Sequence, residues 1–321
     1  MKKTPVLILV GLAWLPTALA AEPALSTEIV PDQEWIVRWQ GQPVCVYHFG
    51  ADRKKPYVRE LRPIKGRNIL RDSPEDHLHH HALMYGIRVN GVNFWEEAGR
   101  YGLEKPVEVL GERAGADRQG RSRASFRQRL IWVGAEPGDK PLLHEERALT
   151  VAVDEATQEV ALVWRSRFEP AAGVDRVKLE GANYHGLGMR FLHELDPLAV
   201  HWVGGEKPDL NDNRQDVRAA RWGAVVFNRP EHPATVVLAG SPQNRGAPAH
   251  FFSMRTPFAY LSATQNLDQE PLEYAAGETW TLTHLVLLYP EPKTSAYIDE
   301  RVSSWNRTAG RRARSNASGG N

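Results

Sequence analysis

Apolar and polar residues alternate with a period of two through most of this sequence, which makes β-strands its dominant element. Leu149 to Val153 shows the pattern, because successive side chains of a strand point to opposite faces of a sheet. Helical periodicity is confined to 295–305, where Ile298 and Val302 belong to an apolar stripe. About fifteen strands with one short C-terminal helix predict an all-β protein, a large antiparallel β-sandwich or barrel, and exclude a βαβ fold.

Turn signals divide the chain into these strands. Asn90-Gly91, between two apolar runs, is the strongest of them, because both residues of a tight hairpin turn must accept positive φ. Gln40 to Pro43 marks a second hairpin. The predicted strands are 35–39, 44–47, 82–89, 92–95, 106–113, 123–133, 143–153, 159–168, 174–180, 187–193, 199–203, 221–228, 234–239, 249–254, 258–263 and 279–289.

The N-terminus carries the pattern of a secretory signal. Lys2 and Lys3 precede an apolar stretch from Val6 to Leu15, and Ala18-Leu19-Ala20 is a small-x-small cleavage pattern. The stretch is short for a membrane span, although an uncleaved anchor is the alternative. We expect cleavage after Ala20, export to the periplasm or the medium, and no later transmembrane segment. The expected organisation is a signal peptide at 1–20, one domain at 21–306 and a disordered basic tail at 307–321.

Charge and cysteine content narrow the class of protein further. Loss of Lys2 and Lys3 takes Lys+Arg from 40 to 38 against 39 acidic residues, so the mature net charge is −1. This balance argues against nucleic acid as a partner. Cys45 is the only cysteine, so an internal disulfide is excluded and the fold depends on its core.

The segment from Asp76 to His81 holds four of the twelve histidines. In an extended strand, His77, His79 and His81 would share one face and His80 the other. Two such imidazoles could ligate a divalent metal, with His77 and His79 as candidates and Asp76 orienting a ring. The same groups could instead move protons. The structural alternative is a sheet edge capped by histidines that bond to backbone.

Two further segments combine aromatic and charged groups. In 93–97, Trp95 beside Glu96 resembles the wall of a sugar site, while Trp95 also suits a core position. In 183–191, Gly186 and Gly188 indicate a tight bend or a close backbone approach, so that His185 and Arg190, beside Tyr184, would be displayed from a rigid sheet edge. Arg190 could hold a ligand carboxylate or form a structural pair with an aspartate.

Motifs of several enzyme classes are missing from the sequence. It contains no phosphate-binding glycine loop, no Gly-x-Ser-x-Gly elbow and no Cys-x-x-Cys pair. Nucleotide hydrolases, serine esterases and zinc ribbons are therefore excluded.

Several of these segments together resemble the signature of one bacterial family, called PmoA-like or methane oxygenase and otherwise counted as a domain of unknown function. They are Lys55-Pro56-Tyr57, Leu61-Arg62-Pro63, Asp76 to His80, Asn90 to Trp95 and Tyr184 to Phe191. The resemblance spans about 35–290 and implies a carbohydrate context. The family pattern includes His77, His79 and His80 but not His81. Because His80 would point away from His77 and His79 in a regular strand, this pattern conflicts with a metal bound on one strand face. Methane monooxygenase subunits have long membrane helices, which this chain lacks, so that activity is excluded.

A more distant resemblance links the C-terminal third to aldose mutarotases. It rests on Ser262 to Asn266 and on Ala276 to Thr283. It implies a mutarotase-like supersandwich with a sugar-sized cleft. Ala263 stands where those enzymes carry the catalytic base, so their mechanism is not implied.

These observations predict an exported carbohydrate-active protein with a carbohydrate ligand. His77, His79, His80, His185 and Arg190 are the expected catalytic groups, and Asp76, Trp95, Glu96 and Tyr184 the expected substrate-binding groups. Hydrolase, lyase and epimerase chemistry stay open. The alternatives are a non-catalytic glycan-binding protein and a metal-dependent oxidoreductase.

Overall fold

The structure is a computed structural model that describes residues 24–117, 120–210, 214–228, 231 and 233–318, with side chains as far as Thr308. The expected signal peptide and its cleavage site lie outside the described residues.

Three antiparallel sheets make up the described fold, and two of them are large. The first large sheet has nine strands in the order β1 (Leu25–Val30), β2 (Glu34–Trp39), β3 (Gln42–His48), β4 (Tyr57–Leu61), β5 (Leu83–Gly86), β13 (Gly186–Arg190), β19 (Tyr260–Thr264), β18 (His250–Met254) and β15 (Gln215–Ala219). The small sheet has four strands in the order β20 (Leu272–Ala275), β12 (Arg176–Glu180), β6 (Arg88–Val89) and β7 (Val92–Asn93).

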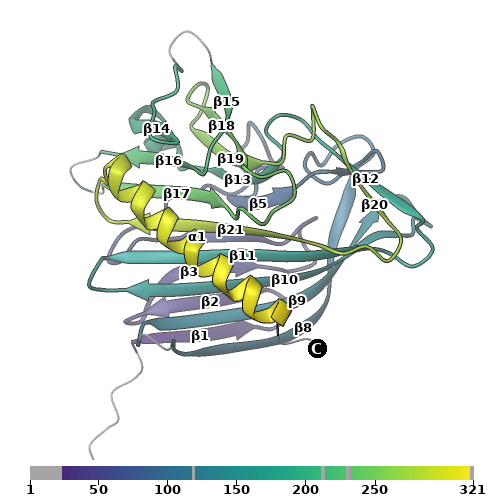
Figure 1. Cartoon of the computed structure of the whole chain (residues 1–321), viewed down its shortest axis with the longest axis horizontal. Helices are drawn as coiled ribbons and strands as arrows, with labels where there is room; N and C mark the ends of the chain where they lie inside the picture. Colours follow the sequence, from purple (N-terminus) through teal and green to yellow (C-terminus); the bar gives the residue numbers. More distant parts are fainter. Residues whose placement is uncertain (1–23, 118–119, 211–213, 229–230, 232, 319–321) are drawn as a thin grey trace, which may run out of the picture.

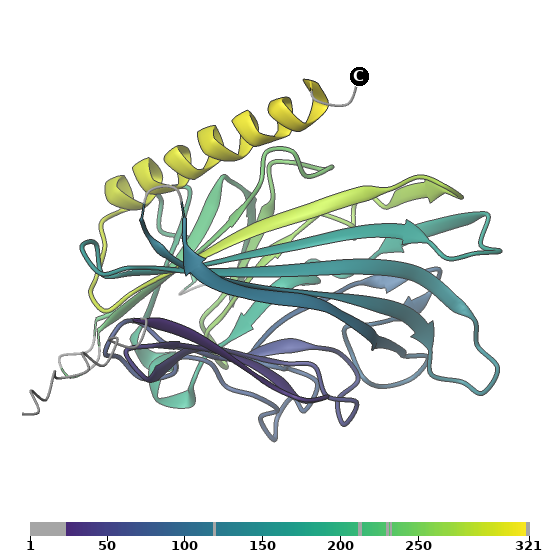
Figure 2. The same cartoon turned by 90° about the horizontal axis from the view of Figure 1, so that it is seen from below.

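The second large sheet contains the longest strands. Its order is β14 (Ala199–Val203), β16 (Trp222–Phe227), β17 (Ala234–Gly240), β21 (Trp280–Tyr289), β11 (Glu159–Pro170), β10 (Pro141–Asp154), β9 (Ser122–Gly134) and β8 (Gly102–Ala116). The two large sheets form separate layers (Figure 2). The expected antiparallel sandwich is therefore confirmed, and the barrel alternative is not.

Aromatic side chains from both layers fill the space between the large sheets. Trp35 on β2 stacks on Phe126 of β9, with ring centroids 5.5 Å apart. Tyr47 on β3 meets Trp164 of β11 edge-on at 6.1 Å. Along β10 every second residue is buried, which is the period that the sequence pattern predicted. This burial is the main source of stability in a chain whose one cysteine is free.

A single long helix, α1 (Ser295–Ser318), crosses the outer face of the eight-stranded sheet (Figure 1). Ile298 and Val302 are buried against that face, as the apolar stripe predicted. The helix runs well past 305, so 307–318 is helical where we expected a disordered tail. The arginines and alanines of that segment are good helix formers, which explains the longer helix.

Both hairpins that were predicted from their turn residues are present. Asn90 and Gly91 have φ of 49° and 77° and join β6 to β7. The predicted strand 82–89 is divided, because β5 pairs in the nine-stranded sheet and β6 in the small one. The second hairpin turns at residues 40–41. The sequence analysis did not predict β1, β4, β15 or β20, and it took 187–193 as one strand where β13 is followed by a 3₁₀ helix, η1 (His193–Leu198).

Candidate functional site

Residues 74–80, which we call the histidine turn, form two successive tight turns. His77 donates its backbone N–H to the carbonyl oxygen of Pro74 (2.9 Å), and His80 donates to that of His77 (2.9 Å). Ser73 has φ of 45°, and the Ser-Pro pair favours a turn over a strand. The expected strand geometry of this segment is therefore wrong.

The turns gather His77, His79 and His80 and direct His81 away from them. The centroid of the His80 ring lies 4.6 Å from that of the His77 ring, on which it stacks. It also lies 4.6 Å from the centroid of the His79 ring, which it meets edge-on. His81 instead contacts carboxylates on another side. The prediction that His81 shares a face with His77 and His79, opposite His80, is corrected accordingly.

The three gathered rings line a cavity of about 320 Å³, which we call the histidine pocket. Six residues selected from the sequence line it, namely His77, His79, His80, Trp95, Glu96 and Tyr184. Its other lining residues are Gln215, Phe252, Met254, Pro257, Phe258 and Tyr260. Segments far apart in the sequence therefore meet at one concave site.

Burial keeps two of the pocket imidazoles neutral. It lowers the pKa of His79 to about 4, and the nearby Lys55 ammonium adds to the effect. Burial lowers the pKa of His80 to about 2, with the neighbouring His79 contributing. At neutral pH each ring therefore offers one N–H donor and one acceptor nitrogen.

Glu96 supplies a negative charge to the pocket wall. Burial opposes its ionisation, but hydrogen bonds from His185, Tyr184 and Asn93 outweigh burial and hold the pKa of Glu96 well below its usual range. The Tyr184 hydroxyl donates to Glu96 Oε1 at 2.7 Å. Burial and this contact raise the pKa of Tyr184, so the phenol stays protonated.

Three buried polar atoms of the pocket wall have no hydrogen-bond partner among the described residues. They are His80 Nδ1, Trp95 Nε1 and the Tyr260 hydroxyl. A buried polar group left unpaired costs about 1–3 kcal/mol, so most are paired in folded proteins. Because these atoms have almost no exposed surface, neighbouring side chains must move before a ligand with hydroxyl or amide groups can pair them.

Glycine makes the close packing of this wall possible. A Cβ at residue 188 would overlap the Tyr260 hydroxyl and the Trp95 ring. Gly186, with φ of 147°, lies against the backbone of Ala263, where a Cβ would also overlap. The close backbone approach predicted for these glycines is confirmed. Ala263 itself is buried in β19.

His185 supports the pocket from behind and is not among its lining residues. Its ring stacks on Trp95, with centroids 5.2 Å apart and planes 16° apart. Its Nε2 lies 3.4 Å from Glu96 Oε1. Burial lowers the pKa of His185, and Glu96 opposes that shift. His185 is thus placed to orient the two groups that reach the pocket.

Arg190 is also outside the pocket lining, and it forms the structural pair that was one of two interpretations. Its Nη2 donates to Asp76 Oδ2 at 3.1 Å. The guanidinium carbon lies 3.3 Å from the centroid of the Phe258 ring. Burial opposes ionisation of Asp76, yet His77 and Arg190 lower the pKa of that carboxyl. Arg190 thereby fixes the start of the histidine turn and one aromatic wall.

The sequence analysis did not select Phe258, Tyr260 or Lys55 as site residues. Both aromatics lie within the predicted strand 258–263, where aromatic side chains are commonly buried. Lys55 was quoted only within a family motif. It is fully buried, donates to the Trp95 carbonyl oxygen at 2.7 Å and lies 3.4 Å from Glu97.

The histidines of the pocket do not by themselves form a metal centre. His77 and His79 have ring centroids 5.7 Å apart. Within the described residues, no three histidine, cysteine, aspartate or glutamate side chains converge in a way that could hold an ion. Structural and catalytic metal sites in proteins use at least three such ligands.

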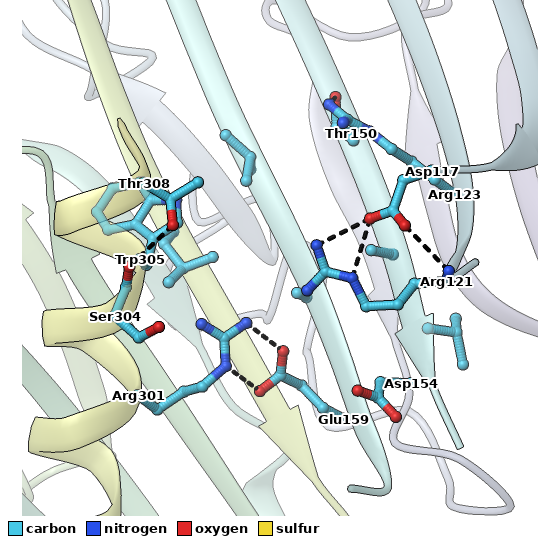
Figure 3. A pocket seen from close by; sticks show the side chains of 15 residues that line it. Asp117, Arg121, Arg123, Thr150, Asp154, Glu159, Arg301, Ser304, Trp305 and Thr308 are labelled. Atoms are coloured by element: carbon cyan, nitrogen blue, oxygen red, sulfur yellow. Dashed lines mark hydrogen bonds and ion pairs between the residues drawn. The ribbon is translucent and has the colours of Figure 1, made fainter. Parts of the chain in front are cut away.

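A second pocket lies beneath α1 on the eight-stranded sheet (Figure 3). Its charged groups are matched within the protein. Arg301 contacts both oxygens of Glu159 at 2.5 and 2.7 Å, and Arg121 pairs with Asp117 at 2.8 Å. Because the histidine pocket instead presents unpaired polar atoms, we place the candidate site there.

Residues 34–303 match the sequence model of a family described as a family of unknown function, DUF6807. The chain belongs to this family. The expected membership in a family of unknown function is confirmed under the name DUF6807, and the PmoA-like name stays a resemblance of motifs. No curated protein matches this DUF6807 chain.

Several solved structures of glycoside hydrolases resemble this DUF6807 chain. An α-galactosidase of family GH36, AgaB from Geobacillus stearothermophilus, has 13% identity and a TM-score of 0.46 over 83% of this chain and 41% of its own. The galactosidase domain of the α-galactosidase-sucrose kinase AgaSK has 11% identity and a TM-score of 0.47, over 83% and 42%. A family GH97 enzyme from Pseudoalteromonas sp. strain K8 has 8% identity and a TM-score of 0.41, over 83% and 34%. The chain thus spans about two fifths or less of the length of these proteins.

Among the described residues, no helix is long and apolar enough to cross a membrane.

Proposed function

We propose that this protein is exported and binds a sugar or sugar derivative in the histidine pocket. One observation carries the proposal. Six residues that the sequence singled out, from three separate segments, line one cavity whose wall holds unpaired buried polar atoms.

The chemistry of the wall suits a sugar ring. Sugars combine apolar C–H faces with many hydroxyl groups. Phe258 and Tyr260 supply the aromatic part of the lining for these faces, and the fully buried Trp95 packs edge-on against Tyr260, with ring centroids 6.2 Å apart. Neutral His79 and His80 and the ionised Glu96 offer donors and acceptors for the hydroxyls. The cavity volume is at the lower end of the range typical of small-molecule sites.

Binding fits the charge states better than acid–base chemistry does. An efficient general acid or base has a pKa near the working pH. His79 and His80 titrate far below neutrality, and Glu96 stays ionised. These three groups therefore serve hydrogen bonding more readily than proton transfer near pH 7.

The binding proposal is tested with an array of mono- and oligosaccharides, followed by calorimetry on each glycan that is retained. We expect His79→Ala and Trp95→Phe to weaken binding at least about tenfold, since each removes a polar contact and packing area. His144→Ala is the matched control, because His144 lies on β10 at a different surface. If the wild-type protein retains no glycan, or if folded His79→Ala and Trp95→Phe bind as wild type does, the proposal is wrong.

Enzymatic conversion of the sugar at the same pocket is the second candidate. It is favoured by the placement of one carboxylate, Glu96, and three imidazoles in the lining of one cavity, since these residue types carry acid–base chemistry in enzymes. Incubation of retained glycans with wild type and with His79→Ala, followed by chromatography, decides it. Product formed by wild type and lost in the variant supports an enzyme. If no glycan is converted, the result supports a binding protein without catalytic activity.

The export proposal rests on the N-terminal signal pattern from Lys2 to Ala20. Expression of the full chain, cell fractionation and N-terminal sequencing test it. We expect protein outside the cytoplasm that starts at Ala21. An intact N-terminus in the cytoplasmic fraction would contradict export, and an intact N-terminus in the membrane fraction would support the anchor alternative.

A further inference from the structure

The histidine pocket has a neighbour on the other side of Pro257. A second cavity of about 680 Å³, which we call the Arg255 cavity, is lined by His193, Glu194, Asp196, Pro197, Leu210, Arg255, Thr256 and Pro257. Pro257 lines both cavities, so the two are separated only by the short segment 255–258.

This divider is held firmly on both sides. On one side, buried Asp196 accepts a hydrogen bond from the backbone N–H of Ala259 at 2.9 Å, which ties η1 to the divider. On the other side, the Phe258 ring packs under the Arg190 guanidinium. Two independent contacts thus keep Pro257 as a fixed rim between the cavities.

The two cavities differ in chemistry in a way that suits successive units of one chain-like ligand. The histidine pocket is the smaller of the two, and its lining contains aromatic side chains and unpaired buried polar atoms. The Arg255 cavity is about twice as large, and its lining includes the exposed polar side chains of His193, Glu194, Arg255 and Thr256. The first fits a single ring held by its faces. The second fits a solvated unit held by its hydroxyl groups.

We propose that the ligand is an oligosaccharide of at least two sugar units that runs over Pro257, with one unit in the histidine pocket and the next in the Arg255 cavity. This inference rests on the proposed sugar binding and extends it by assigning a second subsite. The Arg255 and His193 side chains donate hydrogen bonds to the second unit, and Glu194 accepts them.

The dependence of binding affinity on the number of sugar units tests the second subsite. The probes are glucose, galactose, xylose and N-acetylglucosamine, each as mono- to tetrasaccharides, titrated calorimetrically into the full-length mature protein. For a series that binds, we expect the di- or trisaccharide to bind at least about tenfold more tightly than the monosaccharide.

Substitution of exposed side chains in the Arg255 cavity supplies the matched test. Arg255→Ala and His193→Ala each remove an exposed side chain. Because His193 also contacts the buried Asp196 at 3.2 Å, circular dichroism first establishes that each variant is folded. We expect both to weaken oligosaccharide binding about threefold to tenfold and to leave monosaccharide binding unchanged. His144→Ala is again the control.

The outcomes separate this inference from the proposed function. Monosaccharide binding that depends on Trp95, with no gain from added units or no effect of Arg255→Ala and His193→Ala, overturns the second subsite alone. Absence of binding to every probe, mono- or oligosaccharide, counts against sugar binding itself and removes the second subsite with it.

Discussion

The Nε2 atom of His81 lies 2.9 Å from Oε1 of Glu97, which connects the residue that follows the histidine turn to the segment that carries Trp95 and Glu96. On its other side, His81 Nδ1 lies 2.9 Å from Asp72 Oδ1. Hydrogen bonds, chiefly from His81, hold the pKa of both carboxyls below their usual range against the effect of burial, so each can only accept.

Removal of this bridge is expected to destabilise the protein. His81→Ala leaves two partly buried carboxylates without their shared hydrogen-bond partner, and a buried polar group left unpaired costs about 1–3 kcal/mol. Urea unfolding measures the change in the free energy of unfolding. His144→Ala, at a partly exposed position on β10, should change it by less than about 1 kcal/mol. Equal stability of the two variants would show that the bridge contributes nothing.

Gly188→Ala is expected to distort the histidine pocket. Its Cβ would overlap the Tyr260 hydroxyl and the Trp95 ring, and overpacking of this kind costs about 1–3 kcal/mol. Gly115→Ala is the matched control, because nothing lies within 4 Å of a Cβ there. Thermal unfolding and near-UV circular dichroism of the two variants test this. A wild-type tryptophan signal in folded Gly188→Ala would refute the close packing.

Stability is expected to fall as pH rises from about 4.5 to about 8, through one buried carboxyl. Arg147 is shared between Glu104 (2.8 Å) and Glu145 (2.7 Å). Burial, aided by Glu145, raises the pKa of Glu104 from 4.5 to about 8. Within this window the native state holds a proton that the unfolded chain releases, so the free energy of unfolding declines with pH.

Glu104→Gln stays uncharged at every pH and should remove this slope. We expect the contribution of Glu104 to be on the order of 1 kcal/mol per pH unit across the window. Urea unfolding at several pH values compares wild type, Glu104→Gln and the exposed control Glu108→Gln. A Glu104→Gln slope identical to that of wild type would mean that Glu104 is ionised throughout.

Cys45 is expected to be inert in the native protein. It is fully buried, and burial, with a contribution from Glu60, raises the pKa of its thiol to about 12. The thiolate is the reactive form, so a thiol reagent at about pH 8 should not label the folded chain. One thiol per chain should react after unfolding in guanidinium chloride. Rapid labelling without denaturant would show that the core around Cys45 opens.

Local pattern was sufficient for most of the strands. Burial alternates along β10 with the period of two visible in Leu149 to Val153, because a strand between core and solvent selects residues for each face in turn. The turn at Asn90-Gly91 followed from the positive φ that both residues accept. By contrast, the alternation in β15 (Gln215–Ala219) covers only Asp216 to Ala219, which is too short to predict a strand, and pairing with β18 holds it in place.

For the site, the sequence selected the candidate residues and the tertiary structure decided which of them come together. The density of histidines and the Trp–Glu pair indicated five lining residues of the histidine pocket, and the 183–191 segment indicated Tyr184. Their directions depended on contacts between distant segments. Arg190 meets Asp76, His185 stacks on Trp95, and Tyr260 joins the wall because β13 pairs with β19 in one register. Such contacts are selected by packing and burial in three dimensions, and a one-dimensional pattern contains no signal for them.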